Sequence, residues 1–93
     1  MRRDRVTPEM ALAVFERDRM CVAVKLGEHP SGCRGRLTLD HVRAHPMMGK
    51  RAPSRPESMV ALCEGHHLDT RAGANWATSH RPALREYLLA VTA

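Results

Sequence analysis

The chain has 93 residues, of which 43% are hydrophobic and only 3% aromatic, and it carries a formal net charge of +5. This length allows a single domain (residues 1–93), and a core with so few large rings is expected to need a cross-link such as a metal ion. The charge favours a polyanionic partner, and the chain has neither a run of ~20 apolar residues nor a basic amphipathic helix that would favour a membrane.

The N-terminal part is predicted to contain a basic arm, a helix and a loop. Residues 1–6 form the arm. The pair Thr7 and Pro8 predicts a helix cap followed by proline at the first helical position, and the helix is expected to end near Arg19. The glycines and proline of segment 21–36 then predict a loop.

The remaining elements are a hairpin and two helices. Alternating apolar residues predict a short strand at 37–42, and a long basic loop follows at 43–57. Segment 59–62 is a second short strand or a tight approach to the next helix. That helix is expected at 63–72, and Gly73 immediately after it would end it. The apolar spacing at 81–91 predicts a C-terminal helix that begins with proline.

Three cysteines and one histidine have the spacing of a zinc site. Cys63 and His66 lie three residues apart and would project from the same face of a helix, where thiolate and imidazole can bind tetrahedral zinc together. Cys21 and Cys33 would supply the other two ligands from either end of the glycine-rich loop. The sequence therefore predicts one structural zinc ion.

Several alternatives to this ligand set remain open. His29 could replace one ligand, His67 could exchange roles with His66, and the thiols could be ordinary buried cysteines. An odd number of cysteines argues against a closed disulfide framework. The N-terminal residues also lack the apolar core of a signal peptide, so a cytoplasmic protein with reduced thiols is expected.

A second constellation pairs a carboxylate with imidazoles. Because consecutive helical residues are rotated by about 100°, His67 would turn away from zinc if His66 binds it, and could meet the strand that carries Asp40 and His41. Asp40 and His67 could hold a divalent ion, and His41 could take a proton from an attacking water. In a regular strand Asp40 and His41 point to opposite faces, so the strand is expected to bend or end here. Taken singly, these residues could also be a polar strand end and surface histidines.

Cationic residues near this constellation could contact a DNA backbone. The candidates are Arg43, Lys50, Arg51, Arg55 and Arg71. The first four lie in the predicted loop, which could instead be simply solvated. Arg71 follows His67 by four residues and could hold a phosphate from the same helical face. It could equally be a solvated cation favoured by the helix dipole.

The pair Asp40 and His41 and the segment 62–67 resemble the motifs of the HNH endonuclease family, in particular the small HNH proteins of bacteriophages of high-GC bacteria. Family members carry an Asp-His or His-His pair, then an Asn, and then a Leu-Cys-x-x-Cys-His segment. Here His66 replaces the second cysteine. The resemblance covers about residues 15–72. It implies an α+β fold with a zinc-stabilised ββα-metal core and flanking N- and C-terminal helices.

The resemblance also implies a function and a role for each residue. The protein would be a DNA endonuclease that uses a divalent ion such as Mg²⁺, Mn²⁺ or Ni²⁺. His41 would be the general base, Asp40 and His67 would hold the catalytic ion, and zinc would be bound by Cys21, Cys33, Cys63 and His66. The phage relatives imply a role in DNA processing or packaging, with terminase as a candidate partner.

One position departs from the family pattern. Ser58 stands where the family's central Asn is expected, five residues before Cys63. A serine hydroxyl has fewer hydrogen-bonding groups and a shorter reach than the amide, so weak or context-dependent cleavage is expected.

Two other functions compete with the nuclease. One is a non-catalytic, zinc-stabilised DNA-binding module with a degenerate HNH site, and the other is a zinc-stabilised interaction protein without nucleic acid. Neither of them needs Asp40, His41 and His67 in addition to four zinc ligands. The sequence therefore favours the enzyme.

Overall fold

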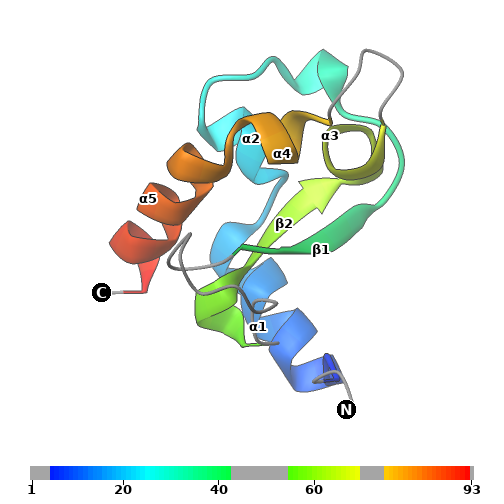
Figure 1. Ribbon diagram of the computed structural model, residues 1–93. Helices are drawn as coiled ribbons and strands as arrows, with labels where there is room; N and C mark the ends of the chain where they lie inside the picture. Colours follow the sequence, from blue (N-terminus) through cyan, green and yellow to red (C-terminus); the bar gives the residue numbers. More distant parts are fainter. Residues whose placement is uncertain (1–4, 43–54, 70–74, 93) are drawn as a thin grey trace.

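The computed structural model describes residues 5–42, 55–69 and 75–92, and shows a small α+β arrangement in which a two-stranded sheet is flanked by helices (Figure 1). The α-helices are α1 (Pro8–Asp18), α2 (Val22–Lys25), α3 (Glu64–Leu68), α4 (Trp76–Ser79) and α5 (Arg81–Val91). The strands are β1 (Leu37–His41) and β2 (Met59–Cys63), and the short 3₁₀ helices are η1 (Pro30–Gly32) and η3 (Pro56–Ser58). The predicted α+β class is confirmed, whereas membership of the ββα-metal fold stays a prediction.

The two strands form the predicted antiparallel hairpin. Leu39 pairs with Ala61 and His41 pairs with Met59, so the ladder stays regular to the end of β1. Of the two expected alternatives at this point, β1 ends at His41 but does not bend at Asp40. Because side chains alternate along a paired strand, Asp40 and His41 lie on opposite faces of the sheet.

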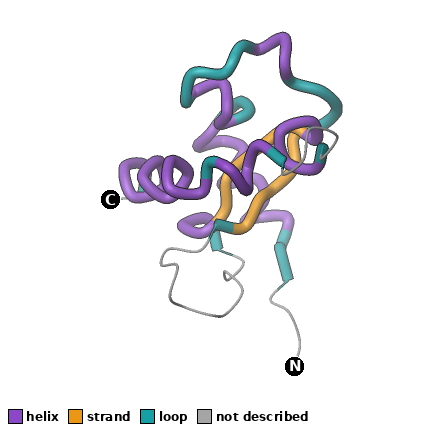
Figure 2. Tube along the Cα trace, turned by 45° about the horizontal axis from the view of Figure 1, so that its top comes forward, coloured by secondary structure: helices purple, strands orange, loops and turns teal. Residues whose placement is uncertain are grey.

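Helices cover both faces of β2, which is buried along its whole length. On one face Val14 of α1 packs against Met59 and Ala61. The other face carries Val60 and Leu62, and packs against residues from three helices: Val22, Ala23, Ala77, Leu84 and Leu88. Figure 2 shows the hairpin between these helical segments. Asp40 shares the second face with Val60, its register partner.

The edge of β2 that does not pair with β1 is closed by side chains from the end of α1 and the residues after it. The Met59 carbonyl accepts from Arg17 at 2.6 Å, the Ala61 N–H donates to Asp18 at 2.9 Å, and the Cys63 N–H donates to the Cys21 sulfur at 3.3 Å. An unpaired strand edge invites pairing with other chains, so these bonds protect it while they anchor α1.

Asp18 is the centre of a buried polar network. Its carboxylate is fully buried and accepts from the Arg17 guanidinium at 2.7 and 3.0 Å and from the Tyr87 hydroxyl at 2.5 Å. Burial and the hydrogen bond to Asp18 raise the pKa of Tyr87, which keeps the phenol protonated as a donor. The network thus joins α1, β2 and α5 through one carboxylate.

Replacing Asp18 with Asn should lower the free energy of unfolding by about 3 kcal/mol, because it removes the negative charge that compensates Arg17 in a buried network. Urea unfolding of the zinc-loaded protein, followed by circular dichroism, measures this loss. The control is Glu16→Gln on the exposed side of the same helix. A loss below about 1 kcal/mol, the usual size for an exposed ion pair, would show that Asp18 does not hold α1, β2 and α5 together.

Most helix predictions hold, and the exceptions are local. Thr7 caps α1 by accepting from the Met10 N–H at 3.1 Å, and α5 spans the residues predicted for the C-terminal helix. Segment 21–36, expected to be a loop, contains α2 and η1, because α2 buries Val22 and an adjacent alanine in the core. No signal predicted α4.

The helix that begins after Cys63 is shorter than expected. It ends at Leu68, and Asp69 already has extended backbone angles. The glycine at 73 that was expected to end it lies outside the described residues. Within the described ranges, no helix combines the length and apolar character needed to cross a bilayer.

Candidate metal centre

Cys21, Cys33, Cys63 and His66 come together although they lie up to 45 residues apart. Their ligand atoms, three Sγ and one imidazole nitrogen, all lie within 4.8 Å of one another. Cys21 immediately precedes α2, Cys33 follows η1, and Cys63 and His66 flank the start of α3. Within the described part of the chain this is the only group of three or more Cys, His, Asp or Glu residues found so close together.

The spacing of the ligand atoms fits tetrahedral zinc. The His66 Nδ1 lies 3.1 Å from the sulfur of Cys63, 3.6 Å from that of Cys21 and 3.9 Å from that of Cys33. Zinc at ~2.3 Å from sulfur and ~2.0 Å from nitrogen requires sulfur–nitrogen separations of roughly 3.5 Å, and the three distances bracket this value. Three thiolates and one imidazole are also a common donor set for structural zinc.

Backbone donors prepare Cys63 to bind a cation. Burial opposes its thiolate, but hydrogen bonds from the backbone N–H groups of Arg34 and His66 outweigh burial and lower the pKa of Cys63 to about 6. Cys63 caps α3 in this way, and its sulfur accepts from the His66 N–H at 3.4 Å. A thiolate at a helix N-terminus is the ionised form that zinc requires.

Cys33 behaves in the opposite way. Burial, its hydrogen bond to Cys63 and repulsion from Cys21 raise the pKa of Cys33 to about 12, since neighbouring thiolates cannot all ionise without a cation between them. All three cysteines can therefore be thiolates at once only when a bound cation compensates their negative charge.

Zinc affinity should rise about tenfold or more for each unit of pH between about 6.5 and 8, because zinc must displace the proton of Cys33, which stays bound throughout this range. Cys63 contributes little to this slope because its pKa lies below the range. Competition with a chelator of known affinity at pH 6.5 and 7.5 measures the effect. A pH-independent affinity would mean that Cys33 is a thiolate before zinc binds.

A tight turn after Cys33 brings this ligand to α3. Gly35 adopts φ +72°, and a Cβ at this residue would lie 2.6 Å from the Glu64 carboxylate. That carboxylate accepts from the Arg36 N–H at 2.8 Å, and the Gly65 N–H donates to the Arg34 carbonyl at 3.1 Å. The turn thus lies on the first residues of α3, and only glycine fits its centre.

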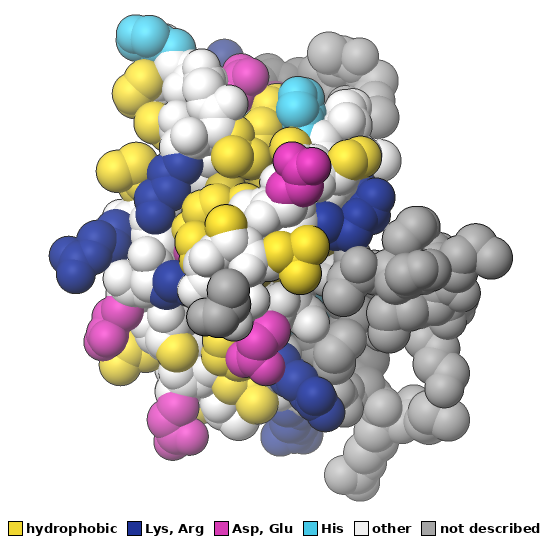
Figure 3. Space-filling view, turned by 90° about the vertical axis from the view of Figure 1, so that its left-hand side faces the viewer, with side chains coloured by type: hydrophobic (Ala, Val, Ile, Leu, Met, Phe, Trp, Pro, Cys, Tyr) yellow, Lys and Arg dark blue, Asp and Glu magenta, His cyan; other side chains and the backbone are white. Residues whose placement is uncertain are grey.

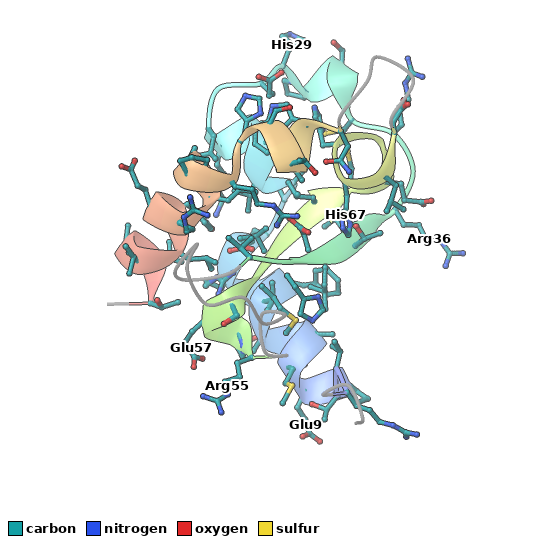
Figure 4. All side chains as sticks on the ribbon, in the orientation of Figure 1. Glu9, His29, Arg36, Arg55, Glu57 and His67 are labelled. Carbon is teal, nitrogen blue, oxygen red and sulfur yellow. The ribbon has the colours of Figure 1, made fainter. Side chains whose placement is uncertain are left out.

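The alternative zinc ligands are not found in the cluster. His29 is exposed, and its Nδ1 accepts from the Ser31 N–H at 3.1 Å. His67 faces the hairpin, and Figure 4 shows it beside β1, well apart from His29. His66 and His67 therefore turn to different sides of α3, as their rotation about the helix axis predicts.

His67 meets the strand at two atoms. Its Nε2 lies 3.3 Å from Asp40 Oδ1, and its Nδ1 lies 2.7 Å from the Thr38 hydroxyl. The side chain of Asp40 is only 5% exposed. Two ligands of one ion, each at ~2.1 Å and about 90° to 110° apart, lie ~3.0 to ~3.4 Å from each other, so the Asp40–His67 spacing suits a divalent cation.

Thr38 determines which nitrogen of His67 carries a proton. The Thr38 hydroxyl donates its single proton to the Leu62 carbonyl at 2.7 Å, so it can only accept from His67 Nδ1. Nδ1–H is therefore the donor, and Nε2 faces the Asp40 carboxylate with either a second proton or a lone pair. With a lone pair on Nε2 the two groups could share a cation, and a histidine whose other nitrogen donates to a nearby oxygen is typical of metal sites.

Arg81 is a site residue that the sequence did not reveal. One guanidinium nitrogen, Nη1, donates to Asp40 Oδ2 at 3.2 Å and to the His41 carbonyl at 2.8 Å. Thr38 was also missed, although it lies two residues before Asp40 and strand alternation puts both on one face. No sequence pattern places Arg81 near Asp40, because the two residues lie 41 positions apart in the chain.

The other predicted site residues are not gathered around Asp40. His41 is half-buried and, by alternation, lies on the face that packs against α1. Ser58 is buried in η3, and its carbonyl accepts from the Val42 N–H at 2.7 Å, which extends the hairpin by one bond.

Of the five predicted DNA contacts, only Arg55 belongs to the described residues, and it is exposed before η3. Arg43, Lys50, Arg51 and Arg71 lie outside them. The described residues contain equal numbers of cationic and anionic side chains, so the net charge of the chain comes from the other segments. On the face shown in Figure 3 the two signs are interspersed, without a patch of one sign.

Comparison with known proteins identified no matching family model, no matching curated protein and no matching solved structure.

Proposed function

We propose that the protein is a divalent-metal-dependent DNA endonuclease of the HNH type, stabilised by a structural zinc ion. The observation that supports this most directly is the pairing of Asp40 Oδ1 with His67 Nε2 at 3.3 Å. The pair joins the first strand of a strand–strand–helix unit to its helix, and Thr38 fixes the proton of His67 on the other nitrogen. Such a pair leaves coordination positions for water and phosphate.

In this proposal the two groups of ligands have different tasks. Zinc is bound by Cys21, Cys33, Cys63 and His66, whose distances suit a closed tetrahedral site. Asp40 and His67 hold a second ion, for which Mg²⁺, Mn²⁺ and Ni²⁺ are the candidates. When bound, that ion stabilises negative charge that develops on the phosphate.

The residues of the chain act on the substrate as follows. Asp40 and His67 bind and orient, and His41 at the end of β1 accepts a proton from the attacking water. As the water oxygen bonds to phosphorus, the bond from phosphorus to the leaving oxygen breaks, and that oxygen takes a proton from solvent. The resemblance alone suggests phage DNA processing or packaging, with terminase as the candidate partner.

Cleavage of supercoiled plasmid by zinc-loaded protein tests the proposal. Cutting should require Mg²⁺, Mn²⁺ or Ni²⁺ and fail in EDTA. Asp40→Asn and His67→Ala should each reduce it at least about 100-fold, whereas Glu57→Gln, an exposed carboxylate in η3, should leave it unchanged. Equal zinc content in all variants ensures that the fold is intact. Cutting that persists in Asp40→Asn would contradict the proposed ion site.

A second candidate is a zinc-stabilised DNA-binding module without catalysis. Three observations favour it: Asp40 and His41 lie on opposite faces, Arg81 already pairs with Asp40, and Ser58 replaces the family Asn. This module would retain zinc and bind DNA in a salt-dependent manner, but cut under no ion.

Either function predicts DNA binding through segment 43–55. Replacing Arg43, Lys50 and Arg51 together with Gln should weaken binding at every DNA sequence, and should reduce the slope of log K against log salt by ~2.7, or ~0.9 for each phosphate that is no longer neutralised. Fluorescence anisotropy with a duplex oligonucleotide at several salt concentrations measures both quantities. An unchanged slope would show that these side chains are solvated and do not touch phosphates.

A further inference from the structure

Arg81 touches both residues at the end of β1. Its Nη1 lies 3.2 Å from Asp40 Oδ2 and 2.8 Å from the His41 carbonyl oxygen. The guanidinium comes from the first residue of α5, and α5 is held in the core by Leu84 and Leu88. The arginine therefore bridges a well-anchored helix and the strand end.

The two oxygens of Asp40 have separate partners. Arg81 contacts Oδ2, while Oδ1 faces His67 Nε2. A carboxylate with one partner can rotate about its terminal bond and exchange its oxygens, because this torsion is broad and two-fold. Two partners on opposite oxygens remove that freedom. The second bond of Arg81, to the His41 carbonyl, fixes the backbone that carries the carboxylate.

We propose that Arg81 is a positioning residue that fixes Asp40, so that Oδ1 alone faces His67 and binds the divalent ion. This inference rests on the proposed function, because it needs an ion at the Asp40–His67 pair. Arg81 acts through Asp40 and donates to it from the side opposite His67. It remains 34% exposed, so its charge is partly screened by solvent.

Mn²⁺ affinity tests the proposal without any measurement of cleavage. Zinc-loaded wild-type protein and Arg81→Met are titrated with Mn²⁺, and free ion is followed by electron paramagnetic resonance. Arg81→Met should bind Mn²⁺ about tenfold more weakly, within the range seen for partners that orient metal ligands. Arg85→Met, one turn along the same helix and without a contact to Asp40, is the matched control and should bind Mn²⁺ normally.

A conservative variant and a double-mutant cycle separate positioning from folding. Arg81→Lys keeps a cationic donor and should recover most of the affinity, which also provides a folded variant if Arg81→Met is unstable. In an Asp40→Asn background, Arg81→Met should have no further effect on Mn²⁺ binding, because the carboxylate that Arg81 positions is no longer present. Zinc content and the thermal midpoint of each variant show that the fold persists.

The outcomes of these titrations distinguish failure of the positioning role of Arg81 from failure of the proposed function. Unchanged or tighter Mn²⁺ binding in Arg81→Met would overturn the positioning role, and tighter binding would mean that repulsion from the guanidinium dominates. A full additional loss in the Asp40→Asn background would overturn it too. If wild-type protein does not bind Mn²⁺, or binds it equally well in His67→Ala, the proposed function itself fails. Binding that needs His67 but ignores Arg81 overturns only this inference.

Discussion

Cys63→Ala is expected to unfold the domain and to abolish zinc binding. Cys63 is 3% exposed, ends β2, caps α3, and lies nearest to the His66 ligand nitrogen. Structural zinc in small domains contributes ~10–16 kcal/mol of apparent binding free energy at pH 7, which is at least as large as the ~5–15 kcal/mol that stabilises a typical domain. A site with three ligands keeps only part of that contribution. Circular dichroism and zinc analysis of the purified variant measure both losses.

Wild-type protein stripped of zinc is the control, and it should give the same spectrum as Cys63→Ala. Trp76 offers a second signal, because it is the only tryptophan and its ring lies 5.6 Å from that of His66. Its fluorescence should change in parallel with the loss of helix. A Cys63→Ala protein that stays folded without metal would disprove the structural role of zinc.

The sequence predicted the zinc ligands because their signal is local. Cys63 is the N-cap of α3 and His66 is its third helical residue, so their convergence follows from the local geometry of a helix start. The cap and first turn of α1 and the apolar stripe of α5 are local for the same reason. Only the joining of Cys21 and Cys33 to this pair required the tertiary fold, and the chemistry of zinc supplied the reason to expect it.

The missed features depend on distant contacts. Arg81 reaches Asp40 only because α5 packs beside the hairpin, and a lone arginine before a proline gives no sign of that. Helix α2 has four residues and relies on burial rather than on propensity. Of the two expected alternatives at Asp40 and His41, the strand end occurs and the bend does not, because the bend was inferred from the function that the pair was supposed to perform. The backbone follows the ladder to Met59 instead.

Helix α3 links the two candidate sites. His66 points to the sulfur cluster and His67 to Thr38 and Asp40, so whatever holds α3 also positions the second site. Within the described residues α3 spans only Glu64–Leu68, too short to be stable by itself. Zinc is therefore expected to maintain the Asp40–His67 pair as well as the fold, and its removal should eliminate the second site.

His41→Ala should abolish plasmid cleavage while fold, zinc content and Mn²⁺ affinity remain those of the wild type. Loss of a general base costs typically ~10²–10⁴-fold in rate. His41 is half-buried at the last residue of β1, and neither the bond from Arg81 to its carbonyl nor its register with Met59 needs the imidazole. Cleavage in saturating Mn²⁺, compared with Mn²⁺ titration of the same protein, separates loss of a proton acceptor from loss of an ion ligand.

His29→Ala is the matched control, because His29 is an exposed histidine outside both clusters and its removal should leave cleavage unchanged. If His41→Ala cuts as fast as the wild type, the imidazole on the α1 face does not reach the phosphate, and another group accepts the proton. If instead the wild type binds DNA and Mn²⁺ but cuts under no ion, the opposite placement of Asp40 and His41 is the physical reason, since the ion and the base would then act on different faces of the hairpin.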